Sequence, residues 1–364
     1  MPIVKCSNCL SPYPDTGAPY CCPFCGGVFD ILKLEAFDKA MVDCRQPGIW
    51  KYSYTFGLEK NASVVSLGEG DTPLVWTHVN GKQIAFKCEY LNPTGSFKDR
   101  GNAVIAGFLC SRGVRYALED SSGNAGASFA AYAARAGIKA KIFIPDSASG
   151  MKRRQIEMYG AEVVRILGPR SNAAEAVLRA ADNEHVYASH AYMPYNLPGY
   201  ATLAYELVEQ LGVSPGTVTM PIGQGGLFIG LVRGFENLVN AGMIAKVPKM
   251  VGVQALACAP LWALHQYGPA GLSLVGETKS LAEGIVVRFP VRGDMLLHLC
   301  DTYGAEVYAV EEPEITQGYL ELARRGFFVE PTSAVVWGAL QAGMNRWPDP
   351  VVVILTGNGL KAVI

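Results

Sequence analysis

The chain of 364 residues has no long uninterrupted apolar run and no block of lysine or arginine. No stretch approaches the roughly 20 apolar residues that a membrane-spanning helix needs, and residues 1–5 lack the apolar segment of a signal peptide. The formal net charge is −1, which argues against nucleic acid as a partner. We therefore expect a cytoplasmic protein that binds neither membranes nor nucleic acids.

Two glycine signatures of nucleotide-binding proteins are also missing. Neither GxGxxG nor GxxxxGK[ST] occurs in the chain, so nothing indicates a dinucleotide fold or a nucleotide phosphate loop. What the chain does have is a composition that is 50% hydrophobic. A chain of this length can bury one large core, or two moderate cores with a small appendage. The composition favours a globular protein with a small polar substrate.

The N-terminus is rich in cysteine. Cys6-x-x-Cys9 and Cys22-x-x-Cys25 form two pairs near glycine and proline turn formers, 12 residues apart. Four thiolates can close a tetrahedral shell around zinc and leave no open position for a substrate, so the zinc would be structural. The spacing predicts a zinc-ribbon-like segment over residues 1–28. A ribbon that has lost its metal, or that only packs its cysteines, is the alternative.

Beyond residue 60, apolar strand-like runs alternate with amphipathic helical stretches. This alternation is typical of an α/β protein with mainly parallel sheets. We expect strands at residues 114–119, 141–145, 162–167, 185–189, 218–222, 250–255, 306–310 and 351–355. We expect helices at residues 124–136, 151–159 and 172–182, and a short helix at residues 32–40. The pattern predicts two sheet-based lobes with a ligand cleft between them.

The most informative segment is residues 92–101, NPTGSFKDRG, which places Lys98 between a glycine turn and a helix. Burial disfavours the charged form of an amine, and a neutral lysine can condense with an aldehyde cofactor. Pyridoxal phosphate is the cofactor that uses such a bond. A solvated charged turn is the alternative interpretation of the same residues.

A second segment, Ser121-Ser122-Gly123-Asn124, follows one expected strand and opens the next expected helix. Its backbone N–H groups and hydroxyls would face an anion at the helix N-terminus, and a carboxylate suits that place. Serine and asparagine are also favoured helix caps, so an ordinary cap is the alternative.

A glycine-rich turn follows the strand expected at residues 218–222. Glycine lets the backbone approach closely and turn several N–H groups toward one phosphate. The turn consists of Gly223, Gln224, Gly225, Gly226 and Leu227. Near the C-terminus, Thr356 directly follows the last expected strand.

These segments, in this order, resemble the threonine synthase family within the tryptophan-synthase-like (fold type II) pyridoxal-phosphate enzymes. The resemblance covers the chain from about residue 66 to the C-terminus, including LGEGDTPL at residues 67–74. It implies that Lys98 is the Schiff-base lysine and that Asn124 hydrogen-bonds the cofactor ring. It implies that Ser121, Ser122 and Gly123 grip the substrate α-carboxylate.

The same resemblance assigns the glycine-rich turn to the cofactor phosphate and Thr356 to the pyridine nitrogen. A neutral hydroxyl does not hold that nitrogen protonated, which suits the cofactor to β- and γ-elimination and replacement.

One segment departs from the family pattern. Residues 188–202, ASHAYMPYNLPGYAT, lack the arginine and lysine with which threonine synthases commonly bind the phosphate of O-phosphohomoserine. Ser189, Asn196 or Thr202 could still hydrogen-bond a substrate. A histidine can titrate near neutral pH, but we expect His190 to be a packing residue.

We predict an α/β, two-lobed tryptophan-synthase-like fold with the small ribbon attached. Residues 29–95 and 206–364 would form a large cofactor-binding domain, and residues 96–205 a smaller mobile domain. The predicted enzyme is a lyase that converts O-phosphohomoserine to threonine and phosphate, with Lys98 as the general base for the α-proton. We expect a homodimer with a small amino-acid substrate.

Two other functions are considered. A β-elimination or β-replacement enzyme (dehydratase, ammonia-lyase or synthase) on a serine- or threonine-like amino acid is the alternative. A catalytically silent regulatory protein is disfavoured, because the lysine, the asparagine loop, the glycine-rich turn and Thr356 are all present.

Overall fold

The structure is a computed structural model that describes residues 3–59, 62–148, 150–182, 184–276 and 278–362. The chain divides into two compact units, each built from two stretches of sequence. Unit 1 is Met1–Asp71 with Asn92–Thr202, and unit 2 is Thr72–Leu91 with Leu203–Ile364. The predicted domain boundaries stay a prediction. They differ from the two units mainly in residues 29–71, which pack within unit 1.

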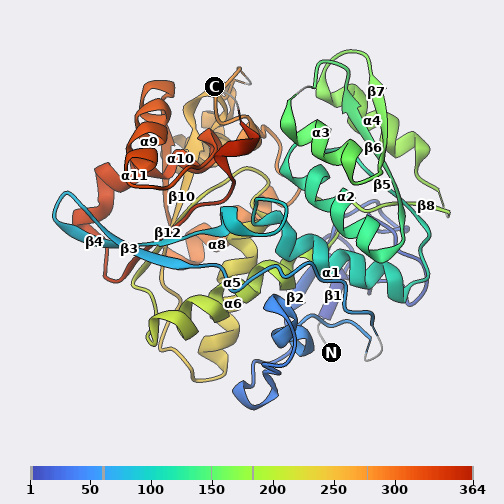
Figure 1. Cartoon of the computed structure of the whole chain (residues 1–364), viewed down its shortest axis with the longest axis horizontal. Helices are drawn as coiled ribbons and strands as arrows, with labels where there is room; N and C mark the ends of the chain where they lie inside the picture. Colours follow the sequence, from blue (N-terminus) through green and yellow to red (C-terminus); the bar gives the residue numbers. More distant parts are fainter. Residues whose placement is uncertain (1–2, 60–61, 149, 183, 277, 363–364) are drawn as a thin grey trace. The chain divides into compact units, whose positions relative to one another are not determined.

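Unit 1 begins with an antiparallel pair of strands, β1 (Ile3–Cys6) and β2 (Phe29–Lys33), drawn in blue in Figure 1. The helix predicted at residues 32–40 is wrong. The segment instead begins as strand β2, and only the single 3₁₀ turn η1 (Lys39–Met41) follows. Pairing with a strand more than 20 residues away decides its conformation, because tertiary context overrides local propensity. The longer 3₁₀ helix η2 (Gly48–Thr55) comes next.

The main sheet of unit 1 has four parallel strands in the order β7-β6-β5-β8. Its strands are β5 (Tyr116–Glu119), β6 (Lys139–Pro145), β7 (Glu162–Ile166) and β8 (His185–Tyr187). Its helices are α1 (Lys98–Ser111), α2 (Asn124–Ala136), α3 (Met151–Met158) and α4 (Arg170–Ala180). Helices α2 and α3 pack together, and α4 packs on β6, β7 and β8 (Figure 1). The predicted strands and helices of this region are confirmed, with ends shifted by a few residues.

Unit 2 contains a six-stranded sheet in the order β11-β10-β9-β12-β4-β3, parallel except for the edge strand β3. Its strands are β3 (Leu74–Val79), β4 (Lys82–Lys87), β9 (Thr217–Pro221), β10 (Lys249–Ala255), β11 (Glu306–Val310) and β12 (Val351–Ile354). The sequence analysis omitted the β3–β4 hairpin. Its turn, Asn80-Gly81, has positive φ at both residues (49° and 83°), as a two-residue hairpin turn requires.

Helices surround this sheet (Figure 1). They are α5 (Asn196–Leu211), which begins in unit 1, α6 (Gly226–Asn240), α7 (Pro260–Tyr267), α8 (Gly293–Tyr303), α9 (Glu312–Arg324), α10 (Pro331–Ala334) and α11 (Val336–Gly343). The 3₁₀ helices are η3 (Glu89–Leu91), η4 (Leu256–Cys258), η5 (Gly268–Leu274), η6 (Glu283–Ile285), η7 (Met344–Arg346) and η8 (Gly359–Lys361). Strand β12 is buried along its whole length in the core of unit 2. Within the described residues, every helix is too short or too polar to span a bilayer.

Candidate active site

Lys98 is the first residue of α1, and the loop before it is held by a buried carboxylate. The backbone N–H of Thr94 donates to Asp99 Oδ2 at 2.7 Å, and Thr94 Oγ1 donates to Asp99 Oδ1 at 2.6 Å. Asp99 is fully buried, so these charge-assisted bonds are shielded from water. Lys98 itself is half-buried, with its Nζ 4.8 Å from the centre of the Phe97 ring. The loop therefore fixes the place where the lysine leaves the backbone.

The turn in this loop depends on Gly95 and Asn92. Gly95 has φ of +84°, a conformation that favours glycine, and its N–H donates to the Asn92 carbonyl at 2.7 Å. The Asn92 side chain accepts from the N–H of Gly70 at 2.9 Å. The sequence analysis singled out Lys98 but did not assign roles to Asn92, Thr94 or Asp99. Their role is to hold the lysine loop in one conformation.

The LGEGDTPL segment, interpreted from the sequence as a plain turn, contains a buried structural carboxylate. Glu69 is fully buried and accepts hydrogen bonds from Trp50 Nε1 at 2.9 Å and Tyr132 Oη at 2.7 Å. Burial raises its pKa, and the hydrogen bond from Tyr132 opposes that rise. Glu69 therefore joins η2 to α2 within unit 1.

The asparagine loop lies against the same helix that begins at Lys98. Asn124 is the first residue of α2, and Asn102, one turn beyond Lys98 in α1, donates from Nδ2 to the Ala125 carbonyl at 3.3 Å. A Cβ on Gly126 would collide with the carbonyl oxygen of Ser121. The loop at Ser121–Asn124 is thus folded tightly over the start of α2, where backbone N–H groups have no acceptor within the helix.

Ser189 and Asn196, the other predicted substrate residues, also lie in unit 1. Ser189 is fully buried after β8, and Asn196 starts α5. A Cβ on Gly101 in α1 would lie 2.7 Å from the Tyr200 ring and 2.9 Å from Asn196 Cβ, so α5 packs directly on the Lys98 helix. The buried Oδ1 of Asn196 has no hydrogen-bond partner among the described residues.

The segment 188–202 has no cation of its own, but one reaches it from α1. Arg100 Nη1 donates to Thr202 Oγ1 at 3.0 Å, and the Thr202 hydroxyl donates to the Gly199 carbonyl at 2.6 Å. Both side chains are fully buried. Thr202 is therefore committed to the packing of α1 on α5.

A buried acid, Glu119, was not identified from the sequence. It ends β5, and its Oε1 lies 2.7 Å from His190 Nδ1. Burial, opposed by the hydrogen bond from the His190 backbone and by the charge of Lys98, raises the pKa of Glu119 to about 8. Burial and then the charge of Lys98 lower the pKa of His190 well below its ordinary value. The acid that ends an expected strand beside the asparagine loop was the available signal for this pair.

Unit 2 contains the glycine-rich turn and Thr356. Gly225 has φ of +80° and precedes α6, and a Cβ on Gly223 would lie 3.1 Å from Ile285 Cα. The Gln224 side chain accepts from the Val291 N–H at 3.0 Å, which leaves the backbone of the turn as its anion-binding surface. The first amides of α6, including those of Gly226 and Leu227, have no acceptor within the helix. This arrangement fits a phosphate group.

Thr356 follows β12, which pairs in parallel with β9, so it lies at the same sheet edge as the glycine-rich turn. The register that pairs Val353 with Thr219 places Thr356 level with Ile222, directly before the turn. Thr356 is buried, and its hydroxyl lies 3.4 Å from the Ser333 hydroxyl, which in turn accepts from the Thr356 N–H at 2.6 Å. A hydroxyl held this way fits a neutral hydrogen-bond partner for a ring nitrogen.

The four predicted zinc ligands meet in unit 1. The sulfurs of Cys6 and Cys25 are 3.5 Å apart, those of Cys9 and Cys22 are 3.6 Å apart, and all four lie within 4.8 Å of one another. A tetrahedral zinc with Zn–S bonds of about 2.3 Å separates its sulfurs by about 3.8 Å. The donor set therefore fits zinc, although other soft ions suit four thiolates too.

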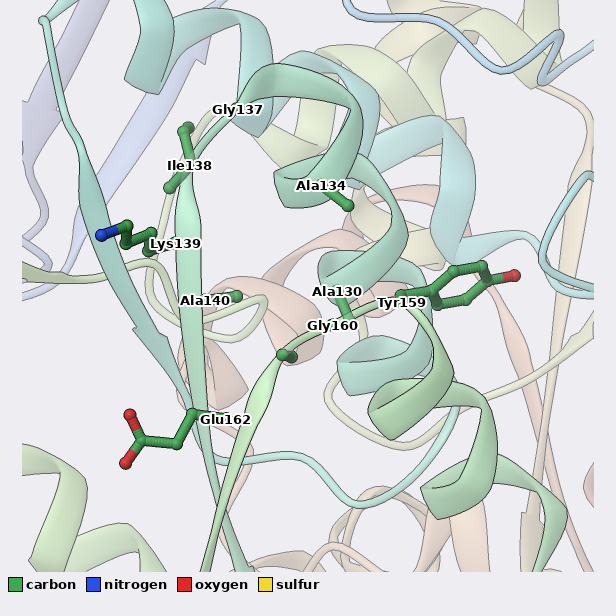
Figure 2. A pocket seen from close by; sticks show the side chains of 10 residues that line it. Ala130, Ala134, Gly137, Ile138, Lys139, Ala140, Tyr159, Gly160 and Glu162 are labelled. Atoms are coloured by element: carbon green, nitrogen blue, oxygen red, sulfur yellow. The ribbon is translucent and has the colours of Figure 1, made fainter.

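A separate hollow of about 490 Å³ lies elsewhere in unit 1, lined by residues of α2, β6 and the segment after α3 (Figure 2). Alanines 130 and 134 line it from the helix, and Figure 2 shows Lys139 and Glu162 at its strand side. None of the predicted site residues lines this hollow, and we assign it no role.

Comparison with known proteins defines the class first. Residues 65–357 match the family described as pyridoxal-phosphate dependent enzyme. The structure resembles a threonine deaminase from the organism abbreviated T.th. (TM-score 0.64, 25% identity, 79% of this chain and 92% of that one). It shares its fold with an L-serine ammonia-lyase from Rhizomucor miehei (TM-score 0.68, 19% identity, 80% of this chain and 94% of that one). The predicted fold class and cofactor class are confirmed.

Whole-chain relatives narrow the class. The threonine synthase of Methanocaldococcus jannaschii is 31% identical over 99% of this chain and 93% of its own length. That of Mycobacterium tuberculosis is 35% identical over 82% of this chain and 83% of its own length. The chain belongs to the threonine synthase family of pyridoxal-phosphate dependent lyases.

Proposed function

We propose that this enzyme converts O-phosphohomoserine to threonine and phosphate. The observation that carries the proposal is the lysine loop, in which Asp99 and Thr94 fix Lys98 at the start of α1. It is supported by similarity to threonine synthases over nearly the whole chain. When bound, pyridoxal phosphate supplies the electron sink that makes the substrate α-proton acidic.

The residues of the chain divide the remaining work. Lys98 would bind the cofactor covalently, and its amine would remove the α-proton. Ser121, Ser122 and Gly123 would hold the substrate carboxylate, and Asn124 would fix the cofactor ring. The turn at Gly223, Gln224, Gly225, Gly226 and Leu227 would hold the cofactor phosphate, with Thr356 as the partner of the ring nitrogen. Ser189 and Asn196 would contact the substrate side chain.

A second function is favoured by one specific observation. The substrate-side segment 188–202 contains no cation, and its neighbour Glu119 is an acid. A phosphate without cationic partners forgoes charge-assisted bonds of roughly 1.5–3 kcal/mol each. A serine- or threonine-like amino acid that undergoes β-elimination or β-replacement makes no such demand.

One comparison separates the two functions. Phosphate and threonine are measured with O-phosphohomoserine, beside keto-acid release from serine and threonine, on the same preparation. Threonine formation with kcat/KM of about 10⁴ M⁻¹s⁻¹ or more supports the synthase. Keto-acid release without threonine formation refutes it in favour of the lyase alternative. Turnover of none of these substrates would argue against both and favour the regulatory alternative.

We further propose that the four-cysteine cluster holds one structural zinc. The aromatic contacts of Tyr13 support this role, because its ring packs on Phe29 of β2, Phe108 of α1 and Tyr195 (centroid distances 4.6, 5.8 and 5.5 Å). The ribbon would thereby brace the helix that begins at Lys98. A cytoplasmic homodimer remains our expectation, and light scattering of the purified protein tests the dimer.

A further inference from the structure

Glu119 and His190 form a buried acid–imidazole pair that the proposed roles do not use. They are 71 residues apart in sequence and meet because β5 and β8 are adjacent parallel strands, so their carboxyl ends share one edge. Glu119 Oε1 lies 2.7 Å from His190 Nδ1, and the His190 backbone N–H donates to Glu119 Oε2 at 3.2 Å. Two bonds to one carboxylate fix the imidazole in place. Such pairing is how enzymes orient a histidine for proton transfer.

The imidazole has one nitrogen left for chemistry. Nδ1 is engaged by Glu119, and the structure shows no hydrogen bond to Nε2 from any described residue. The side chain of His190 is 9% exposed. The Asn196 side chain donates to the His190 carbonyl, and the buried Asn196 Oδ1 has no hydrogen-bond partner among the described residues. The pair is thus accompanied by a second polar atom available to a ligand.

The charges around the pair decide where its proton lies. Lys98 of α1 and Arg170 of α4 act on both groups, and Asp120 lies beside Glu119 at the end of β5. Tyr187 of β8 and Tyr200 of α5 also lie within the field of Glu119. Burial raises the pKa of Glu119 to about 8 and lowers that of His190. Near neutral pH, the proton therefore lies on Glu119, and His190 is neutral with its hydrogen on Nε2.

We propose that His190, positioned by Glu119, exchanges a proton with the β-oxygen of the amino-acid substrate. This inference rests on the proposed lyase function and extends it. Both candidate reactions involve that oxygen, because β-elimination releases it and threonine formation adds it from water. The proposal assigns the substrate a β-hydroxyl, in the reactant or in the product.

The proton balance is closed by the pair itself. As the Cβ–O bond breaks, its electron pair leaves with oxygen, Nε2–H gives its proton to that oxygen, and water is released. The Glu119 carboxyl gives its proton to Nδ1, so the pair ends as a carboxylate and a neutral imidazole with its hydrogen on Nδ1. The α-proton removed earlier remains on Lys98. Hydration runs the same transfers in reverse, with water losing a proton to Nε2.

A leaving-group comparison tests this role. Serine needs a proton on its departing oxygen, whereas β-chloroalanine releases chloride and needs none. We expect His190→Gln and Glu119→Gln to lower keto-acid release from serine by roughly 10²–10⁴-fold, the usual contribution of general acid catalysis. Release from β-chloroalanine should stay within a few-fold of wild type. The ratio of the two rates in one preparation is independent of the folded fraction.

A matched control lies on the same strand. His185 also pairs with an acid, Asp182, at 3.1 Å, but on the surface. His185→Gln should leave both rates unchanged. Equal loss on both substrates in the His190 variant would show a structural role and overturn the proposal, as would an unchanged ratio.

A measurement without turnover separates the pair from the proposed function. Infrared difference spectra between wild type and Glu119→Gln should contain the carbonyl stretch of a protonated carboxylic acid at pH 6, lost as the pH rises through about 8. Its absence at pH 6 would overturn the proposed proton position. If wild type releases keto acid from neither substrate and forms no threonine, the lyase function fails, and this band alone then decides the state of the pair.

Discussion

The hydroxyl of Thr94 offers a quantitative test of how the lysine loop is held. Thr94→Val keeps the shape of the side chain and the backbone bond to Asp99 Oδ2, but it removes the 2.6 Å bond to Asp99 Oδ1. Hydrogen bonds to charged groups contribute about 1.5–3 kcal/mol, and a buried carboxylate that loses a donor is not rescued by water. We expect the free energy of unfolding to fall by about 2–3 kcal/mol.

The assay is urea unfolding at constant slope, since a change in midpoint without a change in slope reports stability alone. Thr55→Val is the matched control, because the fully buried Thr55 hydroxyl donates at 2.8 Å to a neutral acceptor, the Tyr52 carbonyl. Its loss should cost about 0.5–1.5 kcal/mol. Only Thr94→Val should also lower turnover, because Lys98 follows the loop. Equal destabilisation by the two variants, or unchanged turnover in Thr94→Val, would refute the reasoning.

Four further predictions follow from the structure. Lys98→Ala should abolish turnover and the visible absorbance of the covalently bound cofactor, whereas Lys141→Ala, at an exposed ion pair, should change neither. Protein purified without chelator should contain about one zinc per chain by elemental analysis, and serine at any of the four ligand cysteines should remove it and lower the unfolding midpoint. Lys87 Nζ is fully buried and 2.7 Å from Glu206, so Lys87→Met should cost about 3–5 kcal/mol in urea unfolding, while Lys87→Met with Glu206→Leu should recover most of that loss. The pKa of Glu119 is raised from 4.5 to about 8 on folding, so the folded state binds its proton more tightly; stability should fall as the pH rises from about 4.5 to 8, and this slope should be shallower in Glu119→Gln.

Much of the candidate site was predictable because its motifs are local. The loop around Lys98, the start of α2 at Asn124 and the turn at Gly225 each need only a few consecutive residues to set their backbone. The cysteine spacing likewise placed four sulfurs within reach of one ion before any fold was known. The parallel strands were found for the same reason, since each is a short apolar run between helices.

The contacts that the sequence did not reveal join distant residues. The strand at Phe29–Lys33 was mistaken for part of a helix because its partner, Ile3–Cys6, lies far away in the chain. The Asn80-Gly81 hairpin, by contrast, was visible in the sequence and was overlooked.

The sequence by itself determined the cofactor chemistry, because Lys98 and the motifs that follow it in order are local patterns. Only the tertiary structure decided what surrounds that lysine. Glu119 and His190 meet through the pairing of β5 with β8, and Arg100 reaches Thr202 across 102 residues. The physical reason is that burial and neighbouring charges set the protonation of a side chain, and both depend on which distant segments pack together.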